Sequence, residues 1–467
     1  MTRADAVTVD VAVAGGGLAG LATAIHLARR GKHVVCIEPR GWPHDSVGES
    51  LEFSAPKLLE NLGIDLTTAG QQRHLYPKTS VRAVGADTEF TVWPPRWWAG
   101  PPIWCSRLAF HTDRRELDRQ LRDLAIKSGV VLLPERVTDV HHSSDRVTAL
   151  ITNHGTTIGA GWYVDASGHT VRLFGRALGL DRRLLGQRRA AYWTRVSESP
   201  TGHATVLHFP EPEIDDLMWA WEIPLNDREI SVGVVMSAAR SSALRADGLG
   251  PRDIFGRQLA AIPRLRSVIA EHADAHLQAT TYTPFRHVRT VGDNWLLVGD
   301  AAAMADPLTS NGVTSALRYA RQAADLVSDN LDHHGLDRRR ANAFERTTSG
   351  VVATLDRAIE AFVYEPAIRR RLGLRWAVNL YAATGVITNS LYAKLNPSGS
   401  MRSHACAAML AASRAWTIAA SSTFSRLGKD RATRPDSQRS SGPSPALPLR
   451  ERHTVIITKG EPVGAPR

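Results

Sequence analysis

The stretch that decides the fold is VDVAVAGGGLAG, residues 9–20. Its first half is an apolar run of the kind that forms a buried strand. Its second half places Gly15, Gly17 and Gly20 in the spacing G-x-G-x-x-G, and a helical run of small and apolar residues continues to Arg30. The pattern therefore predicts a strand, a tight glycine turn and a helix in succession.

Each part of this unit has a physical role at a dinucleotide. Gly15 allows the turn, Gly17 lets the backbone approach a pyrophosphate, and Gly20 lets the helix pack closely on the sheet. The helix N-terminus offers N–H groups and a positive dipole end to the phosphates. A second predicted strand, residues 33–37, ends at Glu38, which can accept hydrogen bonds from a ribose diol. Together these features predict a dinucleotide-binding site.

The composition is that of a globular protein long enough for a large core. The chain has 467 residues, 43% of them hydrophobic and 22% charged, and a net charge of +11. No nucleic-acid motif accompanies this charge, so we expect a basic surface and no nucleic-acid partner. Cys36, Cys105 and Cys406 are far apart and form neither a disulfide framework nor a metal-ligand spacing. Since no apolar signal core precedes the first strand, we expect a cytoplasmic protein. Because the cysteines show no metal-ligand spacing, we also expect that the protein holds no metal ion.

The middle of the chain changes character. Four runs with alternating or β-rich residues, 189–196, 204–209, 217–224 and 230–236, predict an antiparallel sheet. Near the end, the uncharged run 376–393 contains too many polar residues for a membrane span. We expect a buried or interfacial helix there, and we do not favour membrane contact.

We therefore expect an α+β protein with five segments. They are a Rossmann-like nucleotide domain (1–185), an inserted antiparallel substrate domain (186–284), a return segment of the first domain (285–335), a helical C-terminal region (336–427) and a disordered tail (428–467). The tail is expected to be disordered because it is rich in Pro, Ser, Arg and Gly.

Two further motifs accompany the glycine motif. DRRELD, residues 113–118, opens a predicted helix, and LVGDAA, residues 297–302, ends a predicted strand at Asp300. With the glycine motif they resemble the FAD-dependent monooxygenase superfamily of the p-hydroxybenzoate-hydroxylase-like fold. The resemblance implies FAD as cofactor, Asp300 on its ribityl chain and the helix of Arg114 beside it. No second glycine unit for a nicotinamide is visible, so we expect FADH2 to come from a separate flavin reductase, with NAD(P)H that binds only transiently as the alternative.

Within this superfamily, the closer resemblance is to flavin-dependent halogenases. WAWEIP, residues 219–224, matches their W-x-W-x-I-P signature, which implies that Trp219 and Trp221 lie on the substrate side near the flavin. Geranylgeranyl reductases, which are related, carry a similar aromatic box. The motif therefore leaves both kinds of enzyme open.

The stretch DPLTSNG, residues 306–312, is similar to the halogenase pattern D-P-L-x-S-x-G. The sequence departs from tryptophan halogenases at Thr309, where they place a glutamate. The resemblance implies four site positions: Pro307 at the flavin, Ser310 as a catalytic serine, and Asn311 and Gly312 as backbone N–H donors to a halide. A flavin-contacting loop without a halide site is the alternative.

A candidate catalytic lysine completes the resemblance. Gly48 and Glu49 resemble the family's G-E motif, which implies that Glu49 contacts the cofactor. Lys78 falls fifteen residues after Gly63, at the position of the essential halogenase lysine. In that family the lysine side chain can hydrogen-bond or capture the hypochlorous acid made at the flavin and direct it at the substrate.

The expected function is oxidation of an organic, aromatic substrate with reduced FAD and dioxygen, in the form of halogenation by chloride or bromide. The substrate would be a small molecule or carrier-bound. A hydroxylating monooxygenase and a geranylgeranyl-reductase-like flavoprotein are the alternative enzymes, and a flavin-binding protein without turnover is the alternative outside enzymology.

Overall fold

A computed structural model of the chain describes residues 6–40, 46–52, 54–64, 66, 75–93, 109–212, 214–333 and 335–394, with single residues at 412, 415 and 419. The predicted tail, residues 428–467, lies outside the described residues.

The first sheet follows from the glycine motif. Its strand order is β7-β2-β1-β10-β9-β8, and β18 also pairs with β10. The strands are β1 (Ala6–Ala14), β2 (Val34–Ile37), β7 (Val131–Leu133), β8 (Val137–Ser143), β9 (Arg146–Thr152), β10 (Thr157–Asp165) and β18 (Trp295–Leu297). Strands β7, β2, β1, β10 and β18 are parallel, whereas β8 and β9 form an antiparallel hairpin. Parallel strands end at one edge of the sheet, and this edge carries the predicted nucleotide residues.

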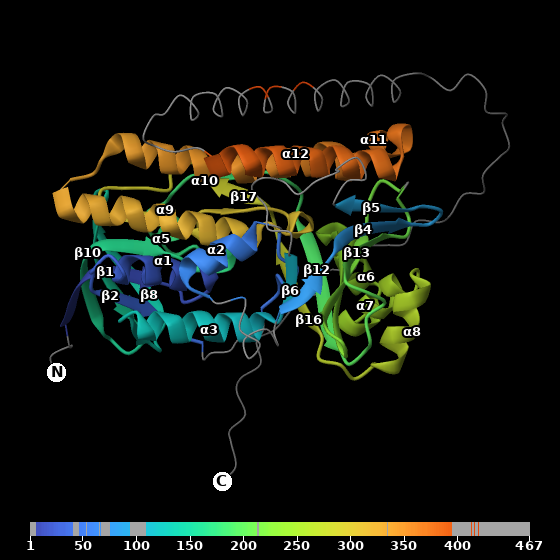
Figure 1. Ribbon diagram of the computed structural model, residues 1–467, viewed down its shortest axis with the longest axis horizontal. Helices are drawn as coiled ribbons and strands as arrows, with labels where there is room; N and C mark the ends of the chain where they lie inside the picture. The colour runs from blue at the N-terminus through green and yellow to red at the C-terminus, as the bar shows by residue number, and fades with distance from the viewer. Residues whose placement is uncertain are drawn as a thin grey trace, which may run out of the picture. The chain divides into compact units, whose positions relative to one another are not determined.

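Helices cover the first sheet and fill its main core. They are α1 (Leu18–Ala28), α2 (Ala55–Leu62), α3 (Arg114–Lys127) and α9 (Gly312–His333). Buried Leu, Ile, Val and Ala side chains of α1 and α9 meet in one cluster, as Figure 1 shows for the two ribbons. Helix α3 begins where Asp113 accepts a hydrogen bond from the backbone N–H of Arg115, which is an ordinary N-cap.

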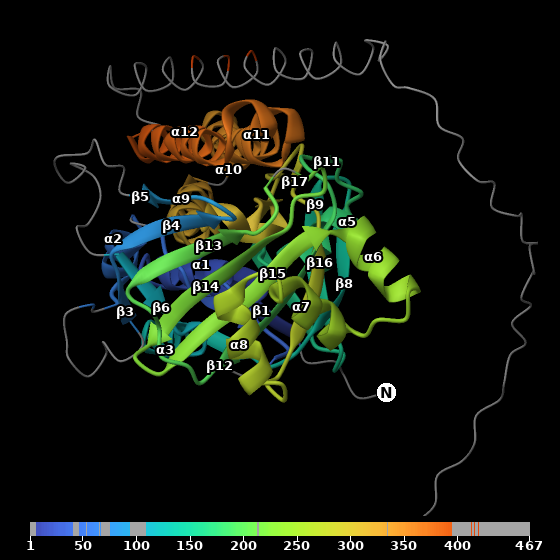
Figure 2. The same ribbon diagram turned by 90° about the vertical axis from the view of Figure 1, so that its right-hand side faces the viewer.

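The second sheet has the order β16-β12-β15-β14-β13-β4-β5. Its strands are β4 (Ser80–Gly85), β5 (Glu89–Trp93), β12 (Arg189–Val196), β13 (Ala204–Phe209), β14 (Trp219–Asn226), β15 (Glu229–Ser237) and β16 (Gln278–Tyr282). The four strands expected between 189 and 236 are present and antiparallel. Strands β4 and β5 were not predicted, and β4 joins β13 in parallel. Figure 2 looks onto the face of this sheet, with its strands spread side by side behind α7 and α8.

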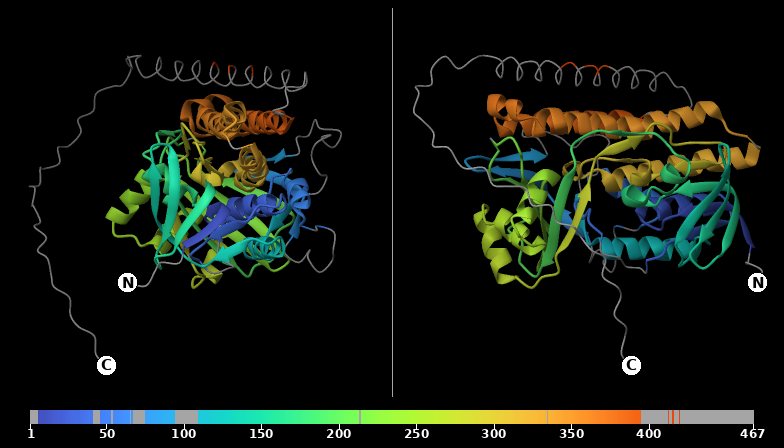
Figure 3. Two further views of the ribbon diagram at one scale, coloured as in Figure 1. Left: turned by 90° about the vertical axis from the view of Figure 1, so that its left-hand side faces the viewer. Right: turned by 180° about the vertical axis from the view of Figure 1, so that it is seen from behind.

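Each face of the second sheet has its own helices. Helices α6 (Ala238–Ala246), α7 (Pro251–Leu259) and α8 (Pro263–Glu271) cover one face. The other face packs against α10 (Arg338–Ala358), the π-helical turn η4 (Ile359–Tyr364) and α12 (Leu374–Lys394), and α11 (Pro366–Leu372) packs against η4 and α12. Figure 3 shows α10 and α12 side by side as one layer.

Small elements connect these layers. They are β3 (Leu75–Lys78) with β6 (Ala109–Thr112); β11 (Arg182–Leu184) with β17 (Phe285–His287) and β19 (Ala303–Met304); α4 (Gly168–Val171) and α5 (Leu173–Ala177); and the 3-10 turns η2 (Gly299–Ala301) and η3 (Pro307–Thr309). The uncharged run 376–393 lies in α12, where Ala377 and Val378 are buried and Trp376 is exposed. No helix in the described part of the chain is long and apolar enough to cross a membrane.

Candidate functional site

The predicted nucleotide residues gather at the carboxyl edge of the first sheet. Gly15 follows β1 and donates its N–H to the carbonyl of Ile37 at the end of β2 (2.8 Å). The N–H of Ala166, just after β10, bonds the carbonyl of Ala14 (2.8 Å). Asp300 follows β18, the parallel neighbour of β10. Four strand ends thus surround the start of α1, where a dinucleotide binds in folds of this kind.

The three motif glycines have three different surroundings. A Cβ on Gly15, whose φ is +108°, would lie 2.4 Å from the carbonyl oxygen of Ala166. A Cβ on Gly20 would lie 1.9 Å from the carbonyl oxygen of Gly15. These two glycines are therefore required by the protein's own packing. Gly17 has nothing within 4 Å of its Cβ position, so there is open space at the N-terminus of α1. This space fits the pyrophosphate of FAD.

Glu38 lies at the end of β2 and is buried. Its carboxylate accepts hydrogen bonds from the backbone N–H of Gly16 (2.9 Å) and from both the N–H and the Nε of Arg40 (3.1 and 2.9 Å). Burial opposes ionisation, but the bonds from Arg40 and Gly16 outweigh it and lower the pKa of Glu38. The side chain is therefore an anionic acceptor beside the glycine turn, as a ribose-binding residue must be.

Asp300 sits on the 3-10 turn η2, which approaches α1 closely. Gly299 has a φ of +58°, and a Cβ there would lie 2.7 Å from the Cβ of Ala19. The Asp300 side chain is 47% exposed, and His169 Nδ1 is 3.9 Å from its carboxylate. An accessible carboxylate at this edge can accept hydrogen bonds from ribityl hydroxyls.

Arg114 and Glu49 are buried and bind other parts of the chain. Arg114 forms an ion pair with Asp118 (3.1 Å) and donates to the carbonyl of Val47 (2.6 Å). Glu49 forms an ion pair with Arg195 (3.4 Å). In this structure, both side chains hold the segment around Val47 against α3 and the second sheet.

The stretch DPLTSNG forms η3 and the start of α9. Asp306 caps η3 by accepting the N–H of Leu308 (3.0 Å). Ser310 adopts a left-handed conformation with φ +48°, and its N–H bonds the carbonyl of Pro307 (2.9 Å). Gly312, the first residue of α9, has nothing within 4 Å of its Cβ position. The positive end of a 22-residue helix therefore faces open space, an environment suited to an anion.

A cluster of buried polar side chains holds this loop in place, and it was not predicted from the sequence. The Asp306 carboxylate lies 3.4 Å from Arg189 Nη1 and accepts the hydroxyls of Tyr282 and Tyr364 (3.2 Å each). Arg189 also pairs with Glu360 (2.6 Å). Burial raises the pKa of Asp306, although Arg189 opposes this. The members come from β12, β16, η4 and the loop, so no local pattern could have joined them.

Trp219 and Trp221 lie on one face of β14 and are 2% and 8% exposed. Their ring centroids are 5.9 Å apart. The indole N–H of Trp219 bonds Tyr364 (2.8 Å), and that of Trp221 bonds Ser231 (3.2 Å). Both rings belong to the same apolar cluster as Leu308 of the loop. The two tryptophans thus form part of the layer against which the loop packs.

Lys78 ends β3 and is 4% exposed. Its Nζ donates to Ser50 Oγ and to the carbonyl of Leu51 (2.8 Å each). Ser50 Oγ is hydrogen-bonded to Thr205 Oγ1 (2.8 Å), and Thr205 Oγ1 to His111 Nε2 (2.8 Å). These four side chains, Lys78, Ser50, Thr205 and His111, are called the lysine network below. Sequence reasoning identified only Lys78 among them.

Burial changes the acid–base properties of this network. It lowers the pKa of Lys78 to about 7, with Glu52 opposing the shift. Burial, and next the charge of Lys78, lower the pKa of His111 well below its ordinary value. The Glu52 carboxylate also accepts the hydroxyl of Thr314, in the first turn of α9 (3.3 Å). The segment that holds Lys78 is therefore joined directly to the helix that begins at the predicted halide loop.

No group of three His, Cys, Asp or Glu side chains that could hold a metal ion occurs within the described ranges.

Two protein families and several curated relatives match this chain. Residues 99–363 match the tryptophan halogenase family, and residues 10–56 match the FAD dependent oxidoreductase family. Menaquinone reductase of Mycolicibacterium smegmatis is 30% identical over 326 residues, which cover 68% of this chain and 76% of that protein. Tryptophan 2-halogenase of Chondromyces crocatus is 28% identical over 343 residues, 68% of this chain and 61% of that protein.

Solved structures support the fold. The flavin-dependent brominase Bmp2 superposes with a TM-score of 0.66 at 22% identity, covering 80% of this chain and 94% of Bmp2. The flavin-dependent halogenase CmlS gives a TM-score of 0.66 at 23% identity, covering 88% and 78%. The expected α+β class with a Rossmann-like FAD domain and the expected family are thereby confirmed. The chain belongs to the tryptophan halogenase family of FAD-dependent oxidoreductases.

Proposed function

We propose that this enzyme halogenates an aromatic substrate, free or bound to a carrier, using chloride or bromide, dioxygen and FADH2 from a separate flavin reductase. The observation that carries the proposal is the lysine network. A lysine amine that is buried, fixed by two hydrogen bonds and able to lose its proton near pH 7 is an arrangement with a chemical use.

The cofactor fits the residues present. Gly17 and the N-terminus of α1 would hold the pyrophosphate, Glu38 the ribose diol and Asp300 the ribityl hydroxyls. Pro307 would contact the flavin, and Arg114 and Glu49 would support the site through the segment around Val47. Bound FADH2 supplies two of the four electrons that dioxygen takes up, and the halide supplies the other two, giving hypohalous acid and water.

The chain's own residues then direct the halogen. The N–H groups of Asn311 and Gly312 at the start of α9 would bind the halide, with Ser310 beside them. The neutral Lys78 amine attacks the halogen of the hypohalous acid. An N–halogen bond forms, the O–halogen bond breaks, and the hydroxide that leaves takes the amine proton and becomes water. The halogen passes to an aromatic carbon, and that carbon's proton returns to the Lys78 nitrogen.

The apolar layer around the loop would keep water away from the reacting atoms. Trp219 and Trp221 line the layer beneath the loop, and the Asp306 cluster fixes the loop on it. Thr309 stands where tryptophan halogenases have a glutamate. A substrate with its own activating group, such as a phenol or a pyrrole, would need no such carboxylate.

A second candidate function is hydride addition to an isoprenoid double bond. The 30% identity with a protein named menaquinone reductase favours it, as does the aromatic box that geranylgeranyl reductases share. Hydroxylation is the third outcome that the fold permits.

One product screen separates these reactions. The FAD-loaded protein is incubated with a flavin reductase, NADH, oxygen, bromide and panels of phenols, pyrroles, indoles and menaquinone, and products are analysed by mass spectrometry. We expect the paired isotope pattern of bromine on an aromatic substrate. A gain of one oxygen would identify a hydroxylase, and a gain of two hydrogens on the isoprenoid chain of menaquinone, rather than on its quinone ring, would identify a reductase. Either result without bromination would overturn the proposal.

A further inference from the structure

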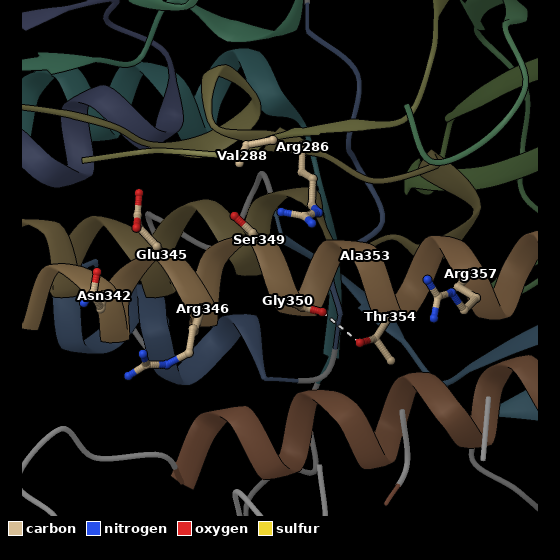
Figure 4. A pocket seen from close by; sticks show the side chains of 10 residues that line it. All are labelled: Arg286, Val288, Asn342, Glu345, Arg346, Ser349, Gly350, Ala353, Thr354 and Arg357. Carbon is tan, nitrogen blue, oxygen red and sulfur yellow. Dashed lines mark hydrogen bonds between the residues drawn. The ribbon is translucent and has the colours of Figure 1, made fainter. Parts of the chain in front are cut away.

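A cavity of about 460 Å³ lies between β17 and α10. Figure 4 shows Arg286 projecting from the strand toward the helix, with Glu345 and Ser349 pointing toward the strand. The helix contributes residues at positions 342, 346, 349, 353 and 357, which are spaced by three or four and therefore share a face. None of the lining residues belongs to the glycine motif, the halide loop or the lysine network.

The cavity is strongly basic. Arg286, Arg346 and Arg357 line it, against the single carboxylate of Glu345. That carboxylate is already used, because it accepts the backbone N–H groups of Thr290 (2.7 Å) and Val291 (3.3 Å). The guanidinium groups of Arg346 and Arg357 are exposed, and neither forms an ion pair or hydrogen bond in the part of the chain that the structure describes.

The floor of the cavity carries a second signal. Ser349 is only 6% exposed, and among the described residues its Oγ has no hydrogen-bond partner. The neighbouring hydroxyl of Thr354, by contrast, bonds the carbonyl of Gly350 (2.8 Å). An unpartnered buried hydroxyl is costly. A ligand oxygen in the cavity would satisfy it.

We propose that this cavity is a binding site for a phosphate ester. A planar guanidinium group binds two oxygens of a phosphate at once, and the lining carries three such groups against one carboxylate. Figure 4 shows the side chains of Arg346 and Arg357 far apart along α10, so each is a separate candidate for the phosphate end of the ester. The volume lies within the range of small-molecule sites and exceeds the needs of a lone phosphate, so it leaves room for an organic portion. The cavity is connected to the loop 306–312 through the small sheet of β17 and β19. In that sheet Arg286 pairs with Ala303, three residues before Asp306.

Binding is tested on the FAD-loaded protein, so that the FAD pyrophosphate site is already filled. Calorimetric titration with glycerol 3-phosphate at low ionic strength should show one site per chain, with inorganic phosphate competing for it. Glycerol, which has the same organic portion without the charge, should not bind.

Variants then locate the site. One of Arg346→Ala and Arg357→Ala should weaken glycerol 3-phosphate binding by about tenfold or more, the value of a lost charge-assisted hydrogen bond, and the other should change it little. Unchanged binding in both variants would overturn the proposal. Ser349→Ala should weaken it less. Arg339→Ala is the matched control, because Arg339 is an exposed arginine of the same helix that does not line the cavity. Absence of saturable binding at millimolar concentrations, or an equal loss in Arg339→Ala, would overturn the proposal.

Discussion

Thr205→Val tests whether the lysine network is a cooperating set of hydrogen bonds. Valine has nearly the shape of threonine but lacks the hydroxyl that joins Ser50 to His111. Ser50 would keep its bond from Lys78, whereas His111 would lose the one partner that its ring has within the described structure, since its Nδ1 is already unpaired. We expect about 1 kcal/mol from the lost Ser50 bond and about 1–3 kcal/mol from the buried, unsatisfied imidazole.

The expected loss in the free energy of unfolding is therefore about 2–4 kcal/mol. It is measured by urea denaturation of the FAD-free protein, because bound FAD would add its own stabilisation. Thr91→Val on β5 is the control; this threonine is exposed, and its change should stay within about 0.5 kcal/mol. Adding His111→Leu to Thr205→Val should recover part of the loss, since no unsatisfied ring then remains. A Thr205→Val protein as stable as the control would refute the role assigned to these bonds.

Three further predictions concern the cofactor and the buried amine. Gly17→Val should abolish FAD binding while leaving the fold intact, because the side chain fills open space that we assign to the pyrophosphate; unchanged flavin affinity by fluorescence titration would contradict this. The pKa of Lys78 is about 7 in the folded protein and 10.5 in the unfolded chain. Between these pH values the unfolded state therefore binds more protons than the folded state. The free energy of unfolding should rise with pH across this window by up to about 1.4 kcal/mol per pH unit. Lys78→Met should lack that rise, and parallel stability–pH curves for the two proteins would argue against a depressed pKa. Stopped-flow absorbance should show slow reduction of bound FAD by NADPH alone and fast turnover once a flavin reductase is added; rapid direct reduction would instead indicate a self-sufficient hydroxylase.

The sequence predicted the parts of the fold that depend on local pattern. The glycine motif, the helix that opens at residues 113–118 and the four strands between 189 and 236 all follow from spacing and periodicity over a few residues. Strand β4 was missed because its pairing with β13 joins segments more than a hundred residues apart, and alternation within the strand carries no trace of that partner.

The candidate site was also predicted only where local pattern or a family motif pointed to a residue. Gly17 and Glu38 could be predicted as nucleotide residues because each follows a strand of a parallel sheet, and parallel strands end at one edge. The role predicted for Asp300 came from the family resemblance. Lys78 was found by its resemblance to a family position, but its burial was not predictable. Its network depends on a bond between Ser50 and Thr205, which are 155 residues apart in the chain. The cluster around Asp306 could not be predicted either, because its members come from segments that are far apart in the chain.

The central claim, that the Lys78 amine carries the halogen, is tested most directly by one ratio: halogenated product formed per dioxygen consumed, in FAD-loaded Lys78→Met with a flavin reductase and bromide. The account predicts that FAD binding and oxygen consumption persist while this ratio falls to near zero. Lys57→Met, an exposed lysine on α2, should keep the ratio of the parent enzyme. A Lys78→Met enzyme that halogenates at the parent ratio would contradict the claim.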